Sequence, residues 1–122
     1  MQNSELYRRG IVCPLDEVAE ERLRRNDVDS ATHVRLLAIP DNLMFTALCQ
    51  LKLFDQINAR CGTLIDDYEE EWVEASGVAA VVAAVDAVAD AASDSRVAAL
   101  LLALRSLAHE AEASSRPLLF IL

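Results

Sequence analysis

Apolar residues recur at helical spacing through the second half of the chain, and this periodicity predicts a fold built on packed helices. In the segment 78–92 the repeating residues are Val78, Val81, Val82, Val85 and Val88. In the segment 96–113 the apolar seam consists of Leu100, Leu101, Leu104 and Leu107. Only three glycines and six aromatic residues occur in 122 residues, a composition that favours helices over a sandwich or barrel.

A further helix is expected from Pro14 to Arg25. Proline suits the first helical position, acidic residues follow it, and arginines lie in the last turn, which matches the helix dipole. Glu20 with Arg24, and Glu21 with Arg25, have the spacing of ion pairs on a solvated face. The apolar stripe of this helix is expected to be Leu15, Val18, Ala19 and Leu23.

Two more helices are predicted in the middle of the chain. Residues 43–61 carry apolar side chains almost all round the helical wheel, which indicates a central helix buried on two sides. Gly62 is a good left-handed cap for it, and Thr63 with Asp66 resembles a capping box. The sequence therefore predicts an antiparallel hairpin with a helix at about 64–75.

Three short segments have the character of strands. Residues 6–13 are ambiguous, whereas 34–39 ends at Pro40 and 118–122 is a continuous apolar run. The natural partner of the C-terminal strand is the strand at 34–39. The overall prediction is one α+β domain over residues 1–122. It is predominantly α-helical, with about five helices packed on a small two- or three-stranded sheet that includes the C-terminal strand.

The net charge of -9 arises in one part of the chain, residues 53–94, which we call the acidic segment. It holds ten Asp and Glu residues against the single cation Arg60, while the rest of the chain carries ten acids and ten bases. A surface of this sign repels phosphate and attracts cations. We therefore expect a basic protein partner, and neither nucleic acid nor a membrane.

The acids of the predicted helix 64–75 fall on one side of its wheel, opposite Tyr68 and Trp72. On the next helix, Asp86 and Asp90 lie opposite the valines. This arrangement indicates an acidic surface available to a partner, with the two aromatic residues as anchors if they are exposed. The candidate partner-binding residues are Asp66, Asp67, Glu70, Glu71, Glu74, Asp86 and Asp90.

In size, charge and the presence of an acidic helix, the chain resembles the small acidic immunity proteins that neutralise toxins exchanged between bacteria. Many of those toxins are nucleases with basic clefts. The resemblance implies an inhibitor with a cognate toxin as partner, and it assigns no residue roles. It favours a non-enzymatic function over an enzymatic one.

The string Glu70-Glu71-Trp72-Val73-Glu74 resembles half of the metal site of all-helical MazG-type nucleotide pyrophosphatases. This alternative implies magnesium held by Glu70, Glu71, Glu74, Asp86 and Asp90. The second half of the family motif, Glu-x-x-Asp, does not occur in the sequence. A third alternative is a structural subunit with a solvated acidic helix, and self-association through the helix 78–92 is a variant of it.

No other catalytic signature is present. The sequence contains no Gly-rich phosphate loop, no Gly-x-Ser-x-Gly and no Cys-x-x-Cys, and His33 and His109 are far apart. Outside the magnesium alternative we therefore expect no cofactor.

Sequence features also indicate where the chain resides. The longest uncharged stretch has eleven residues, short of the roughly 20 that span a bilayer, and no secretory signal is recognisable. A cytoplasmic location is expected. The three cysteines are expected to be reduced and buried; they are Cys13, Cys49 and Cys61.

Overall fold

A four-stranded antiparallel sheet organises the structure, a computed structural model that describes residues 9–27, 33–66 and 70–122. The strand order is β2-β1-β4-β3. The strands are β1 (Gly10–Pro14), β2 (Val34–Ala38), β3 (Glu71–Val73) and β4 (Leu118–Ile121). The sheet thus includes the C-terminal strand, as predicted, but has more strands than expected.

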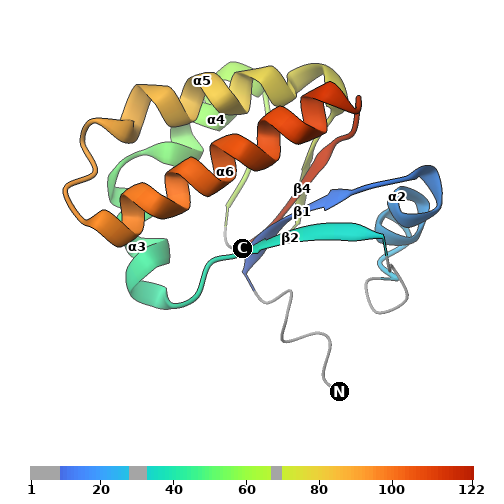
Figure 1. Cartoon of the computed structure of the whole chain (residues 1–122), viewed down its shortest axis with the longest axis horizontal. Helices are drawn as coiled ribbons and strands as arrows, with labels where there is room; N and C mark the ends of the chain where they lie inside the picture. The colour runs from blue at the N-terminus through green and yellow to red at the C-terminus, as the bar shows by residue number, and fades with distance from the viewer. Residues whose placement is uncertain (1–8, 28–32, 67–69) are drawn as a thin grey trace.

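Five α-helices and one 3-10 helix accompany the sheet in the described residues. They are α2 (Glu17–Arg24), α3 (Asn42–Gln50), α4 (Leu53–Cys61), η1 (Ala75–Gly77), α5 (Val78–Ala89) and α6 (Ser95–Ala113). Figure 1 shows α4, α5 and α6 together over one side of the sheet. The predicted helix-dominated α+β class with five helices is confirmed.

The strands alternate between two apolar clusters, one on each face of the sheet. Ile11 and Phe120 belong to the large core beneath the helices, whereas Val12 and Leu119 form a small cluster with Leu23 of α2. On this second face the register aligns one row of residues across all four strands. The row consists of Leu36, Val12, Leu119 and Trp72.

The expected pairing of strand 34–39 with the C-terminal strand is wrong. β1 lies between them, with β2 on one side and β4 on the other. All five residues of β1 are buried, and β1 is one of the two inner strands of the sheet, although the polar residues before it weaken its pattern in the sequence. The partner of a strand is decided by long-range packing, which a local pattern does not contain.

The predicted helix 43–61 is two helices. Lys52 adopts a left-handed conformation with φ of 68°, which ends α3 and redirects the chain into α4. Met44 and Leu48 are buried from α3, and Leu53 and Ile57 are buried from α4. A straight helix cannot bury apolar residues all round its wheel against one core, and the break at Lys52 allows each half to present its own apolar face.

The predicted helix 64–75 is also wrong. Gly62 does cap α4, with φ of 70°, but Thr63 donates its hydroxyl to Asn58 rather than capping a new helix. The Asn58 side chain bonds both the N–H and the C=O of Ile65, at 2.7 and 3.0 Å. Further along, β3 pairs with β4, opposing Trp72 to Leu119. Like charges at i,i+4 disfavour the helix here, while the edge of β4 offers backbone partners to a strand.

The other predicted helices are present with small differences. α5 and α6 bury the expected stripes, except that Val82 and Leu100 are only partly buried. α2 begins at Glu17, because Pro14 completes β1 and Asp16 caps the helix by accepting the Ala19 N–H at 2.8 Å. Its predicted stripe is narrower: Ala19 and Leu23 are buried, but Leu15 and Val18 are exposed. Ala19 and Leu23 are therefore the residues that α2 buries against the rest of the fold.

The three cysteines are all free thiols. Cys13 is buried and Cys61 is partly buried, but Cys49 is exposed, so the prediction of three buried thiols is wrong for Cys49. Among the described residues, no helix combines the length and apolar content needed to cross a bilayer.

Candidate protein-binding surface

The predicted partner-binding acids do not lie on one helix face. Asp66 follows α4 in an irregular segment, Glu71 begins β3, and Glu74 lies between β3 and η1. Asp86 is on α5 and Asp90 is its C-terminal cap. Three residues singled out from the predicted helix lie within or directly after a gap in the described residues. Asp67 and Tyr68 are outside, and Glu70 is the first described residue after the gap.

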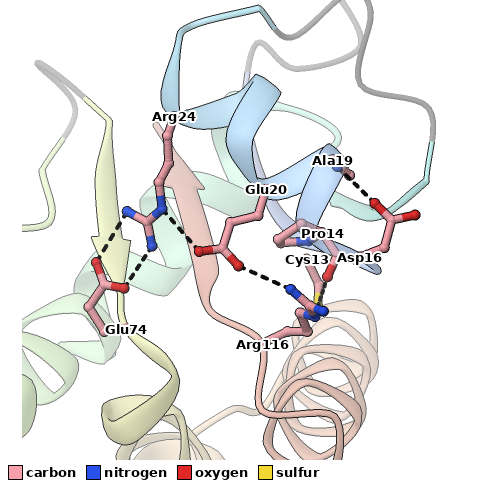
Figure 2. A network of polar contacts seen from close by, with 8 residues as sticks. All are labelled: Cys13, Pro14, Asp16, Ala19, Glu20, Arg24, Glu74 and Arg116. Atoms are coloured by element: carbon pink, nitrogen blue, oxygen red, sulfur yellow. Dashed lines mark hydrogen bonds and ion pairs between the residues drawn. The ribbon is translucent and has the colours of Figure 1, made fainter.

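Glu74 belongs to a network of alternating Arg and Glu side chains that joins α2 to the sheet. Arg24 donates to both carboxylate oxygens of Glu74, at 2.7 and 3.3 Å, and to Glu20 at 3.1 Å (Figure 2). Arg116, before β4, donates to the other oxygen of Glu20 at 3.3 Å. The Arg24 guanidinium also lies 4.1 Å from the centroid of the Trp72 ring. Glu74 and Trp72 are therefore engaged within the molecule, and Trp72 is not the exposed anchor considered from the sequence.

Asp86 is likewise paired within the molecule. Arg105 of α6 donates to its two carboxylate oxygens at 2.8 and 3.3 Å. These hydrogen bonds lower the pKa of the Asp86 carboxyl below its ordinary value of 3.8. The ion pair joins α6 to α5 at the surface. Asp86 therefore stabilises the packing of these two helices, and its carboxylate is already engaged within the molecule.

Because of the Asp86–Arg105 ion pair, part of the free energy of unfolding should depend on pH in the acid range. Because the folded-state pKa is lowered, the stabilisation is present above the ordinary pKa of 3.8 and is lost as the pH falls through the folded-state value. Asp86→Asn should therefore lose less unfolding free energy than the wild type between pH 7 and pH 3, measured by urea denaturation. Arg105→Gln removes the donor instead and should have the same effect. Wild-type acid sensitivity in both variants would contradict the assignment.

Other acids of the acidic segment point to solvent. Asp55 on α4, Glu70 and Asp90 are exposed, and no Lys, Arg or His in the described part of the chain is within ion-pair distance of them. Asp66 is exposed as well. Glu71 is half-buried and accepts the Leu64 N–H at 3.4 Å. The excess negative charge therefore lies on the outside of the fold.

Two of these exposed acids border a hollow between α3, α4 and the segment after α4, which we call the acidic hollow. Its volume is about 260 Å³, and it is lined by Phe45, Cys49, Phe54, Asp55, Ile65, Asp66 and Leu122. The rings of Phe45 and Phe54 are 6.0 Å apart between centroids. The acidic hollow thus combines an apolar floor with carboxylates at its border.

Sequence reasoning did not select Asp55 as a site residue. In a single helix 43–61 it is a lone acid. Asp55 and Asp66 line one hollow because the Asn58 contacts hold Ile65 against α4 and the turn at Lys52 places α3 beside them. The only signal in the sequence is that Asp55 belongs to the acidic segment.

The expected ligands of the magnesium alternative come from different elements of the fold. Among the described residues, no three His, Cys, Asp or Glu side chains form a group that could hold a metal ion. Of its expected ligands, Glu71 lies on a strand, Glu74 is held by Arg24 and Asp86 by Arg105. The resemblance implied an all-helical fold, whereas this chain has a four-stranded sheet.

Comparisons of the chain with models of protein families, with curated proteins and with solved structures gave no match.

Proposed function

We propose that the chain is a non-enzymatic module that binds a basic protein, and that it acts as an inhibitor of the immunity type on a toxin or nuclease with a basic cleft. The observation that supports the proposal is the set of exposed carboxylates in the acidic segment that are not held by arginines of the described fold. These are Asp55, Glu70 and Asp90.

A charge excess of this kind acts mainly on association. Opposite potentials on two surfaces steer their encounter and raise the association rate, and salt weakens this effect because it screens exposed charges. The proposal includes a cytoplasmic location, where the three free thiols stay reduced. In this proposal three residues stabilise the fold that carries the binding surface, because each contacts an arginine of the same chain. They are Glu74, Asp86 and Trp72.

The proposal is tested with the triple variant Asp55→Lys, Glu70→Lys and Asp90→Lys. Wild-type protein is used to capture partners from native lysate of the source cell at low and moderate salt, and the captured protein is purified. We expect a basic protein whose enzymatic activity falls when the chain is added in equal amount. Its affinity should fall by on the order of 100-fold in the triple variant, because like charges facing each other cost several kcal/mol.

The matched control reverses three exposed acids outside the acidic segment, Glu17→Lys, Glu21→Lys and Glu112→Lys. It changes the net charge by the same amount and should retain most of the affinity. Equal losses in both triple variants would indicate a general charge effect and contradict a localised binding surface. A captured protein whose activity is unchanged by the chain would contradict inhibition and favour the structural-subunit alternative.

A further inference from the structure

The acidic hollow is built from two consecutive pairs, each with an apolar residue turned inward and an acid turned outward. In the first pair, Phe54 is 7% exposed and Asp55 is exposed; in the second, Ile65 is 4% exposed and Asp66 is exposed. The Asn58 side chain ties the second pair to α4 by bonding the N–H and C=O of Ile65. The two carboxylates are thus carried by backbone segments that are fixed relative to each other.

The size of the acidic hollow restricts what can enter it. Its volume of about 260 Å³ is below the roughly 300–1,000 Å³ of small-molecule sites. This volume suits one long side chain of a partner rather than a cofactor. The floor of Phe45, Phe54 and Ile65 favours an apolar stem, and the two carboxylates favour a cationic end.

Arginine satisfies both requirements better than lysine. Its planar guanidinium stacks on aromatic rings and bonds carboxylates through two parallel N–H groups, which the point charge of lysine cannot do. The described residues contain this arrangement at Arg24, and Arg9 shows the stacking part of it with an amide oxygen in place of a carboxylate. Arg24 stacks on Trp72 while it binds Glu74, and Arg9 lies 4.1 Å from the Phe45 centroid while it donates to Asn42.

We propose that the acidic hollow receives one arginine side chain of the basic partner. The guanidinium lies at the Asp55 carboxylate, at the border of the acidic hollow, and the alkyl stem lies on Phe54 and Ile65. The Arg9 guanidinium lies over Phe45 and donates to Asn42 and to the C=O of Leu122, so its hydrogen bonds go to groups other than Asp55. The inference deepens the proposed function and rests on it, because the partner supplies the arginine.

The test uses a defined probe, the peptide acetyl-Gly-Arg-Gly-amide, titrated into the isotope-labelled chain and followed by amide NMR shifts. We expect saturable shifts confined to the lining of the acidic hollow. The peptide with citrulline, the uncharged analogue of arginine, should give none, and the lysine peptide should bind more weakly. Asp55→Asn should weaken binding about tenfold, the effect of one charged hydrogen bond. Asp90→Asn, an equal charge change at the C-terminal cap of α5, should have no effect.

Three outcomes would overturn the inference. They are shifts spread over the whole surface, equal binding of the arginine, lysine and citrulline peptides, and equal loss of affinity in Asp55→Asn and Asp90→Asn. The peptide titration is independent of partner capture, so the two proposals fail separately. A captured inhibitory complex with no peptide binding overturns the arginine site alone, whereas peptide binding without any basic partner overturns the proposed function.

Discussion

Phe120→Ala should lower the free energy of unfolding by about 3–5 kcal/mol, the cost of removing a large aromatic side chain from a rigid core. Phe120 is fully buried, and its strand β4 is flanked on both sides, by β1 and β3. Its ring packs edge-on against Phe54 at 6.5 Å between centroids. Because hydrogen bonds hold β4 from both sides, the surroundings cannot collapse into the cavity. Urea denaturation followed by far-UV circular dichroism measures the loss.

The matched control for this prediction is Leu102→Ala on α6. Leu102 is 65% exposed, so its truncation should change the unfolding free energy by no more than about 0.5 kcal/mol. The slope of free energy against urea should be similar in both variants if the transition stays two-state. A loss below about 1 kcal/mol for Phe120→Ala would show that the ring is not in the centre of the core.

The parts of the fold that the sequence predicts well have a single apolar face. In α5 and α6 the buried residues recur at helical spacing with polar residues opposite, so the local pattern and the tertiary environment agree. The C-terminal run after Pro117 is recognisable as a strand for a different reason, because it is apolar throughout and too short for a stable helix.

Where the pattern has no single face, the prediction fails for a physical reason. Residues 43–61 are apolar all round, and only the three-dimensional core determines that the chain turns at Lys52. β1 is an inner strand, yet its position between β2 and β4 depends on pairing with β4, more than a hundred residues away in the sequence. No periodicity within a short window encodes such contacts.

The candidate site could be predicted in its charge but not in its shape. The acidic segment is evident from the sequence, and the structure places acids from it at the surface. A helical wheel grouped Glu70 and Glu74 on one face, but in the structure Glu74 lies after a strand and binds Arg24 of α2, fifty positions away in the chain. Asp55 and Asp66 border one hollow only because of the turn at Lys52 and the Asn58 contacts.

Leu23→Ala should detach α2 from the sheet and lower the unfolding free energy by about 2–4 kcal/mol. Leu23 is 1% exposed and, with Ala19, is one of only two buried residues of this eight-residue helix. It packs in the small cluster with Val12 and Leu119, apart from the large core. Val18→Ala on the same helix is the control, because Val18 is 62% exposed and should be nearly neutral.

Trp72 allows the detachment of α2 to be followed separately from global unfolding. It is the single tryptophan of the chain, and in the folded state its ring lies beneath the guanidinium of Arg24 on α2. In Leu23→Ala we expect its fluorescence to shift to the red at a lower urea concentration than the loss of helical circular dichroism. The large core under α4, α5 and α6 does not contain Leu23, so it should outlast the small cluster. Coincident transitions would instead show that the two faces of the sheet unfold as one unit.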